Sequence, residues 1–227
     1  VSNATITIAD GSNIYAFTES ESTQGLYLSN QPFACIPSHI YNLNIELQEP
    51  INGLNRYTAT SVMPEGIDLD KIICEIYELP EFAIEEEEEN EEVKDTTILA
   101  IYYFGYEPKT IGNYYLYKAY SNDIPLQASS KEYNINSDTY RNGEYLNFTT
   151  FIKNVNGGDN IRFRVYSIER GFYKFIEGLK LIDQNGNANS MSGPPANAVG
   201  NISNGKGLGY FATAYVSEAS SVAIDQR

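Results

Sequence analysis

The feature of this sequence that most limits its fold is an alternation of apolar and polar residues with a period of two. Residues 41–47 are YNLNIEL and residues 4–8 are ATITI, so every second residue is apolar in both segments. Side chains of a strand point alternately to its two faces, so this pattern indicates strands with one buried and one solvated face. Such strands are typical of antiparallel sheets. The sequence therefore predicts an all-β fold.

Turn residues separate the predicted strands. Residues 156–159, Asn-Gly-Gly-Asp, are typical of a tight turn and lie between residues 145–153 and 161–166. We expect these two segments to pair as a hairpin. Residues 98–106 and 114–120 are rich in aromatic and β-branched side chains and are predicted to be strands as well.

One segment has the spacing of a helix. Ser167 can cap it, and Asn185 with Gly186 can end it. Between them apolar residues recur at intervals of three and four, namely Ile168, Phe172, Phe175, Ile176, Leu179 and Ile182. We expect an amphipathic helix over residues 167–184 that covers a sheet or the end of a barrel. A membrane-surface helix is the less favoured interpretation, because it would have a more basic polar face.

A boundary between two parts of the chain is predicted near Pro64 and Gly66, which end one set of strand patterns. We expect an N-terminal β-sandwich module over residues 1–66. A larger antiparallel β domain, which includes the helix, is expected over residues 67–227. No stretch has the roughly 20 consecutive apolar residues that a membrane-spanning helix needs.

Negative charge is concentrated in one segment. The formal net charge is −15, and residues 75–95 carry −10 of it, with 11 acidic residues and one lysine. This balance argues against a nucleic-acid partner, because a phosphate backbone needs a basic surface. The glutamate-rich residues 85–92 predict a solvated loop between strands. A calcium site there is an alternative, although no calcium-loop spacing is present.

The chain has one histidine and two cysteines, which leaves little scope for metal or thiol chemistry. A zinc site would need Cys35, His39, Cys74 and a carboxylate together, and we expect no metal site. Cys35 and His39 have the composition of a nucleophile and its base, but Pro37 prevents a helix from aligning them. A loop leading into a strand is the preferred interpretation. A disulfide between Cys35 and Cys74 is one alternative. Two buried free thiols are the favoured interpretation.

The glycine-rich run GKGLG at residues 205–209 looks like a phosphate-binding loop. Loops of that kind lie between a strand and the N-terminus of a helix. Here a polar loop after Pro194 and Pro195 precedes the run, and residues 210–216, YFATAYV, are predicted to be a strand. We therefore expect no nucleotide and no other cofactor.

Tyrosine is unusually frequent, with 19 tyrosines and no tryptophan. Neighbours on a strand, such as Tyr102 and Tyr103, point to opposite faces, so some of these rings must point outward. Filling of the sheet is the simplest role, but a ring with a polar tip also suits a binding surface, including one for sugars. The candidate binding residues are Tyr103, Tyr114, Tyr115 and Tyr117.

The order of several short motifs resembles a known family. They are VSNATITIAD at residues 1–10, GLYLS at 25–29, YTATSVMP at 57–64, PPANAVGNI at 194–202 and GLGYF at 207–211. The last two are the most specific. Together the motifs cover nearly the whole chain and resemble the bacterial envelope family called domain of unknown function 4249.

The resemblance implies an exported protein, anchored to the outer membrane by a lipid on an N-terminal Cys or located in the periplasm. It also implies association with TonB-dependent outer-membrane systems and an immunoglobulin- or transthyretin-like first half. The family has no assigned catalytic residues. The signal and the anchoring Cys are absent from this chain, which begins at Val1, and trimming explains their absence.

The leading hypothesis is therefore a non-enzymatic binding or accessory protein of the cell envelope that works with an outer-membrane protein partner, such as a TonB-dependent transporter. A glycan-binding module that uses the tyrosine-rich sheet face is the alternative, with an extracellular glycan as partner. An uncharacterised hydrolase is a further alternative, because acidic residues are numerous, but no spacing singles out an acid and a base.

Overall fold

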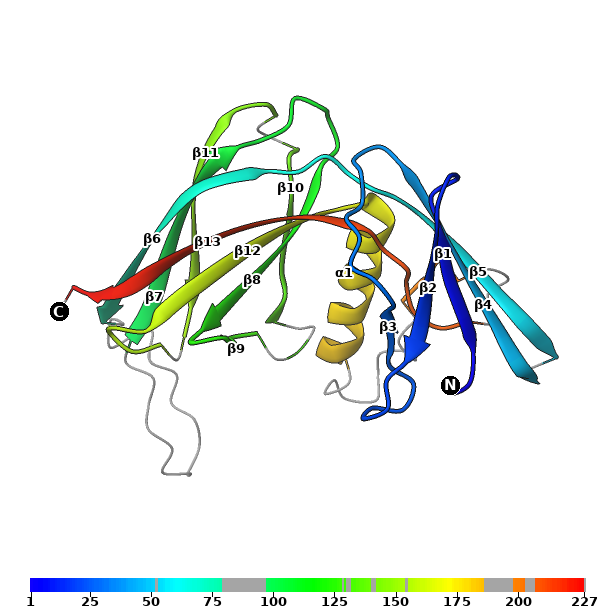
Figure 1. Ribbon diagram of the computed structural model, residues 1–227. Helices are drawn as coiled ribbons and strands as arrows, with labels where there is room; N and C mark the ends of the chain where they lie inside the picture. The colour runs from blue at the N-terminus through cyan, green and yellow to red at the C-terminus, as the bar shows by residue number, and fades with distance from the viewer. Residues whose placement is uncertain are drawn as a thin grey trace. The chain divides into compact units, whose positions relative to one another are not determined.

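The structure is a computed structural model, and strands dominate it (Figure 1). It describes residues 1–51, 53–78, 97–127, 129, 132–139, 142–153, 155–185, 198–202 and 207–226. The strands are β1 (Thr5–Ala9), β2 (Ile14–Glu19), β3 (Tyr27–Ser29), β4 (Ile40–Ile51), β5 (Leu54–Val62), β6 (Asp68–Glu78), β7 (Thr97–Tyr106), β8 (Tyr114–Ser121), β9 (Ile124–Pro125), β10 (Asn134–Ser137), β11 (Tyr145–Ile152), β12 (Asn160–Ile168) and β13 (Ala214–Asp225). The helix α1 (Arg170–Asn185) lies between β12 and β13 in the chain. The predicted all-β class is confirmed.

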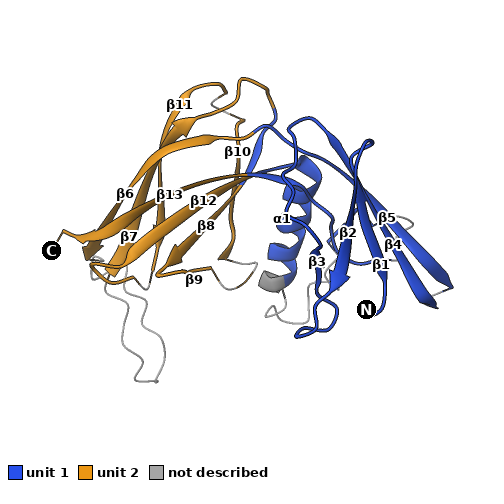
Figure 2. Ribbon diagram, viewed as in Figure 1, with its two compact units in different colours: residues 1–65, 112–115, 167–215 blue, residues 66–111, 116–166, 216–227 orange. Residues whose placement is uncertain are grey.

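Backbone contacts divide the chain into two compact units (Figure 2). Unit 1 comprises residues 1–65, 112–115 and 167–215, and unit 2 comprises residues 66–111, 116–166 and 216–227. The helix α1 therefore belongs to the same unit as the N-terminal strands. Because a compact unit need not fold by itself, the division into domains 1–66 and 67–227 stays a prediction.

Unit 1 contains a five-stranded antiparallel sheet in the order β3-β2-β1-β4-β5. The alternating residues 41–47 lie in β4, where Tyr41 is fully buried and its neighbours Ile40 and Asn42 are exposed. The Tyr41 hydroxyl accepts a hydrogen bond from the backbone N–H of Ile36 at 2.8 Å, so the buried polar tip is satisfied. The alternation thus predicted both the strand and its buried face.

Unit 2 is built on a larger sheet with the strand order β10-β8-β12-β13-β6-β7-β11, to which β9 adds by pairing with β8. Strand β7 is antiparallel to both β6 and β11, and β9 is antiparallel to β8, whereas β13 and β6 are parallel with Ala223 opposite Cys74. The predicted hairpin of residues 145–153 and 161–166 is wrong. Strand β11 pairs with β7, whereas β12 lies between β8 and β13. A turn sequence is a local signal, and the neighbours of a strand are decided by which faces can be buried together.

The large sheet curls around an aromatic core. Tyr103 of β7 contacts Tyr117 of β8, Phe148 of β11 and Phe163 of β12, with ring centroids 5.1 to 5.8 Å apart. Since three strands separate β7 from β8 in the sheet order, these contacts require strong curvature. The two end strands also meet, because the Asn134 side-chain amide on β10 donates a hydrogen bond to Thr150 Oγ1 on β11 at 2.9 Å.

The helix lies close to its predicted position, but Ser167 does not cap it. Ser167 is a buried residue of β12, and α1 begins at Arg170. In residues 161–167 every second side chain is buried, so the strand pattern extends into the expected cap. Glu169 precedes the helix instead, and its carbonyl accepts a hydrogen bond from the Tyr173 N–H at 3.1 Å.

Candidate functional site

The four predicted binding tyrosines do not share an exposed face. Tyr103, Tyr115 and Tyr117 are only 3–4% exposed. Tyr114 is half-buried, and its ring centroid lies 5.0 Å from that of Tyr173 on α1. Burial raises the pKa of Tyr103 to about 12, and the hydrogen bond with Tyr117 partly opposes this shift. These side chains have packing roles in the structure, and ligand binding by them stays a prediction.

An exposed face lies on the opposite side of the same sheet. We call it the outer aromatic face, and it comprises Ile73, Tyr77, Tyr102, Phe104, Tyr106, Tyr145, Phe151, Val222 and Ile224. Strand register places these residues together, because Ile73 pairs with Tyr102 and Tyr106 pairs with Tyr145. All nine belong to unit 2 and to four adjacent strands, β13, β6, β7 and β11.

Seven of these nine side chains are between 36% and 62% exposed, and Tyr106 and Phe151 are the most exposed. Exposed apolar side chains gathered on neighbouring strands make this face a candidate interaction site. The prediction that some tyrosines point outward is therefore confirmed, but for members of the tyrosine set other than those chosen. Because Tyr102 and Tyr103 are neighbours on a strand, the sequence indicates that they point to opposite faces. It does not indicate which of the two faces is buried.

Polar contacts hold the rings of the outer aromatic face in place. The Tyr77 hydroxyl donates to a Glu75 carboxylate oxygen and lies 3.3 Å from the Tyr102 hydroxyl. The Tyr106 and Tyr145 rings meet edge to face with centroids 4.8 Å apart. Lys71 Nζ lies 5.0 Å from the centroid of the Phe104 ring.

Two tyrosines of this face, Tyr77 and Tyr145, have pKa values above the usual value for tyrosine. The hydrogen bond to Glu75 is the largest of several effects that raise the pKa of Tyr77. A hydrogen bond to Asp70 likewise raises the pKa of Tyr145, with a smaller contribution from burial. The face therefore presents positioned rings, which supply contact area with little loss of side-chain entropy on binding.

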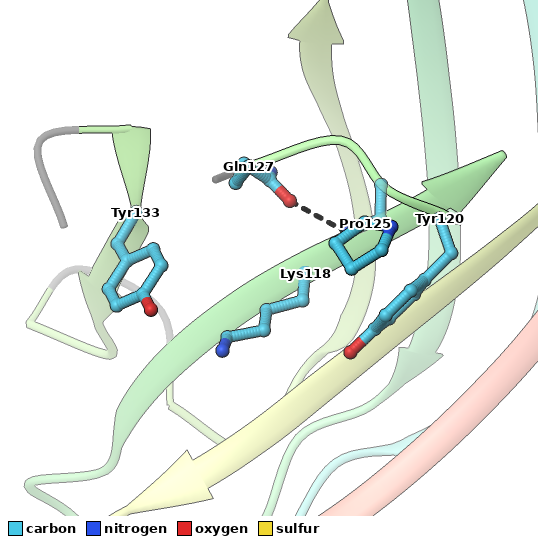
Figure 3. A pocket seen from close by; sticks show the side chains of 6 residues that line it. Lys118, Tyr120, Pro125, Gln127 and Tyr133 are labelled. Atoms are coloured by element: carbon cyan, nitrogen blue, oxygen red, sulfur yellow. Dashed lines mark hydrogen bonds between the residues drawn. The ribbon is translucent and has the colours of Figure 1, made fainter. Parts of the chain in front are cut away.

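A second candidate site is a pocket of ≈ 380 Å³ on β8 (Figure 3). Its lining residues are Lys118, Ala119, Tyr120, Pro125, Gln127 and Tyr133. Its volume falls in the range of about 300–1,000 Å³ that is typical of small-molecule sites. In the sequence Tyr120 is only the last residue of the aromatic-rich segment 114–120, and the pocket is not visible there because β9 brings Pro125 and Gln127 back to β8.

Basic side chains lie beside this pocket. The guanidinium carbons of Arg162 and Arg164 lie 4.9 and 5.2 Å from the centroid of the Tyr120 ring. Burial raises the pKa of Tyr120, but a hydrogen bond with Tyr166 and the charges of Arg164 and Lys118 lower it below its usual value of 10.0. Arg164 also forms an ion pair with Glu218. Three basic side chains, Lys118, Arg162 and Arg164, therefore act on Tyr120 or lie over its ring, in a chain whose net charge is −15.

The motif PPANAVGNI, which carries part of the family resemblance, has a structural role where it is described. Asn201 accepts a hydrogen bond from the Phe211 N–H at 2.8 Å and donates to the Phe211 carbonyl at 2.7 Å. It also donates to the Thr60 carbonyl of β5 at 3.1 Å. A Cβ on Gly200 would lie 1.9 Å from the Gly209 carbonyl oxygen, so only glycine fits there without a backbone shift.

The motif GLGYF is also connected to β5 by hydrogen bonds, which run through the carboxylate of Glu169. The Tyr210 hydroxyl donates to Glu169 Oε1 at 2.7 Å, and the other oxygen of Glu169 accepts from the Val62 N–H at 3.3 Å. Nearby, the Thr213 N–H donates to the buried Ser61 Oγ at 2.9 Å. We refer to these contacts of Ser61, Glu169, Asn201, Tyr210 and Thr213 as the clasp. The most specific motifs of the sequence thus maintain the fold of unit 1.

Both cysteines are free thiols in the structure. Cys74 is fully buried and Cys35 is partly buried. Burial raises the pKa of the Cys74 thiol to about 12 and also raises that of Cys35. The thiolate is the nucleophilic form, so neither thiol is activated at neutral pH. Cys35 and His39 lie in the loop before β4, as predicted.

Other predicted features lie partly beyond the described residues. The glutamate-rich residues 85–92, with their calcium alternative, and residues 205–206 of the glycine-rich run are outside them. Residues 207–209 are described and lead to strand β13, which begins at Ala214, four residues later than predicted. Within the described ranges, no group of three or more His, Cys, Asp and Glu side chains is placed to hold a metal ion.

The two sheets, the curled aromatic core and the clasp define a two-unit all-β protein. The chain belongs to the family described as Domain of unknown function (DUF4249), whose family model matches residues 1–220. The predicted family resemblance is confirmed. No curated protein matches the chain. Where the structure is described, no helix combines the length and apolar character needed to cross a membrane.

Proposed function

We propose that this protein is a non-enzymatic binding or accessory protein of the cell envelope, which binds an outer-membrane protein partner through its outer aromatic face. The exposure of seven apolar or aromatic side chains on four adjacent strands is the observation that carries this proposal. The family resemblance supports the envelope setting, at the outer membrane or in the periplasm, and a TonB-dependent transporter as the partner.

The composition of the outer aromatic face favours a protein as the partner. The cores of protein interfaces are enriched in Tyr and Phe and depleted in charged residues, with polar groups at the rim. Here Tyr106, Tyr145 and Phe151 supply the large exposed rings, and Asp70 and Lys71 supply charges beside them. Large positioned rings of this kind are the side chains that contribute most to binding energy in such interfaces.

Site-specific photo-cross-linking in native membranes tests the proposal. A photoreactive side chain replaces Phe151 in the full-length, lipid-anchored protein, and a matched variant carries it at Ile111, which is 88% exposed but outside the outer aromatic face. We expect one outer-membrane protein to be captured in near-stoichiometric yield from position 151 and not from position 111. Equal capture from both positions, or capture from neither, would contradict the proposal.

The hydrolase alternative is tested by a screen of glycoside and ester substrates, in which we expect no turnover. Free thiols with raised pKa values are unsuited to nucleophilic catalysis, which supports the non-enzymatic proposal. The glycan-binding alternative gains support at a different place from the one predicted, namely the pocket on β8.

A further inference from the structure

The pocket on β8 has walls that are fixed before any ligand arrives. Strand β9 pairs with β8, with Tyr120 opposite Pro125. Beyond β9, the Leu126 N–H donates to the Ala119 carbonyl at 2.9 Å, and the Ala119 N–H donates to Gln127 Oε1 at 2.9 Å. The Gln127 side chain therefore supplies the acceptor that a backbone carbonyl of a neighbouring strand would otherwise give to the Ala119 N–H. Figure 3 draws this hydrogen bond as a dashed line. Pre-formed walls are typical of small-molecule sites.

The polar groups of this pocket are mainly donors. Because the oxygen of Gln127 is already bound to Ala119, its amide nitrogen offers two N–H groups. Lys118 lies across the pocket, with Nζ 4.7 Å from the centroid of the Tyr133 ring (Figure 3). In the part of the chain that the structure describes, no carboxylate pairs with Lys118. Among the described residues, no Asp or Glu lines the pocket, although the chain contains 30 acidic residues.

The remaining walls of the pocket are apolar and flat. The rings of Tyr120, Pro125 and Tyr133 stand around Lys118 in Figure 3. Rings of this kind pack against the apolar face of a ligand and keep a polar tip for its hydroxyl groups. A ligand that matches both sets of groups has a compact ring, several hydroxyls and one anionic group.

We propose that this pocket binds an acidic sugar, with the sugar carboxylate on Lys118 and the Gln127 amide and the sugar ring against Tyr120 and Tyr133. A hexuronic acid, as a monosaccharide or as the end of a polysaccharide, has these features. Arg162 and Arg164 add positive potential beside the site, even though each is paired with an acidic residue. This inference is independent of the outer aromatic face and adds a ligand to the proposed partner protein.

Isothermal titration calorimetry on the whole chain tests the inference, with galacturonic acid, trigalacturonic acid, galactose and acetate as the titrants. We expect galacturonic acid and trigalacturonic acid to bind. Galactose should bind at least about tenfold more weakly because it lacks the carboxylate that forms the charge-assisted hydrogen bond, and acetate should do so because it lacks the ring. Salt at about 0.5 M should weaken the binding of the acids. Monomer and trimer together distinguish a free sugar from the end of a polysaccharide as the preferred ligand.

Two lysine variants provide the matched comparison. Lys118→Met should weaken galacturonic acid binding about tenfold, and Lys118→Arg should retain most of it. Lys71→Met removes another lysine that lies over an aromatic ring, that of Phe104, and should leave the titration unchanged. Near-ultraviolet circular dichroism confirms that each variant is folded.

The inference is overturned if neither galacturonic acid nor trigalacturonic acid gives measurable heat, or if galactose or acetate binds as tightly as galacturonic acid. It is also overturned if the Lys118→Met variant binds galacturonic acid as tightly as the unaltered chain does. The double variant Tyr106→Ala with Tyr145→Ala should keep sugar binding and lose partner capture. The sugar site and the partner face can therefore fail separately.

Discussion

The two faces of the curled sheet in unit 2 use the same residue types for opposite purposes. On the inner face, Tyr103, Tyr117 and Phe163 are buried and contact one another. On the outer face, Tyr106 and Phe151 are more than half exposed. The comparison shows that an aromatic surplus has no single meaning. Alternate residues of a strand point to opposite faces of the sheet. The position of a residue in this alternation therefore decides whether its ring stabilises the core or remains available for a partner.

The largest expected effect comes from removing a ring of the inner face. Phe163 is fully buried, and Phe163→Ala should lower the free energy of unfolding by about 4 kcal/mol, because the cavity cannot close completely. The matched substitution Phe151→Ala on the outer face should change it by less than about 0.5 kcal/mol. Urea denaturation measures both values, and similar losses would show that the two faces do not differ as described.

The clasp extends the comparison to unit 1, where a polar side chain has the structural role. Asn201→Ala leaves the backbone groups of Phe211 and Thr60 without their partner and should cost about 3 kcal/mol. The control Asn136→Ala removes an exposed amide whose oxygen accepts a hydrogen bond from the N–H of the next residue, Ser137, and should be nearly neutral. Equal melting temperatures of the two variants would contradict a structural role for Asn201.

Alkaline pH tests the buried environment of Tyr103 on the inner face. The pKa of Tyr103 is raised to about 12 in the folded chain, against 10.0 when unperturbed, so the unfolded chain loses this proton first. Stability is therefore fully present below pH 10 and falls as the pH rises from 10 to 12, by about 2 kcal/mol for this group. Urea denaturation across that range should show a smaller fall for Tyr103→Phe. An identical fall would exclude Tyr103 as the cause.

The smallest effect on stability is expected where the effect on function is greatest. Tyr106→Ala removes an exposed ring of the outer aromatic face and should change the free energy of unfolding by less than about 0.5 kcal/mol. Because large interface rings carry much of the binding energy, capture of the outer-membrane partner from position 151 should fall at least about tenfold. Unchanged capture would remove Tyr106 from the proposed interface.

Parts of the fold were predictable because their signals are local. The alternation of residues 41–47 reflects the two faces of β4, and the spacing of three and four after Ile168 reflects a helix. The start of that helix was misplaced because Ser167 fits a strand and a helix cap equally well. Its inclusion in β12 depends on a buried face that only the neighbouring strands provide.

The candidate sites were less predictable, because they join residues that are distant in the sequence. The pocket on β8 requires Gln127 to return to Ala119 and Tyr133 to approach Lys118. No periodic pattern records such contacts. The burial of Tyr103, Tyr115 and Tyr117 was not predictable for a related reason. The sequence indicates that Tyr102 and Tyr103 point to opposite faces, but it does not show which of the two faces lies inside.

By itself, therefore, the sequence determined the all-β class, the approximate place of the helix and the family. These properties depend on the conformational preferences of neighbouring residues and on the order of short motifs. Only the tertiary structure decided that β11 pairs with β7 and that Tyr103 lies inside the sheet while Tyr102 lies outside. Strand pairing and curvature arise from burying apolar surface between distant segments, and that free energy belongs to the assembled sheet rather than to any one strand.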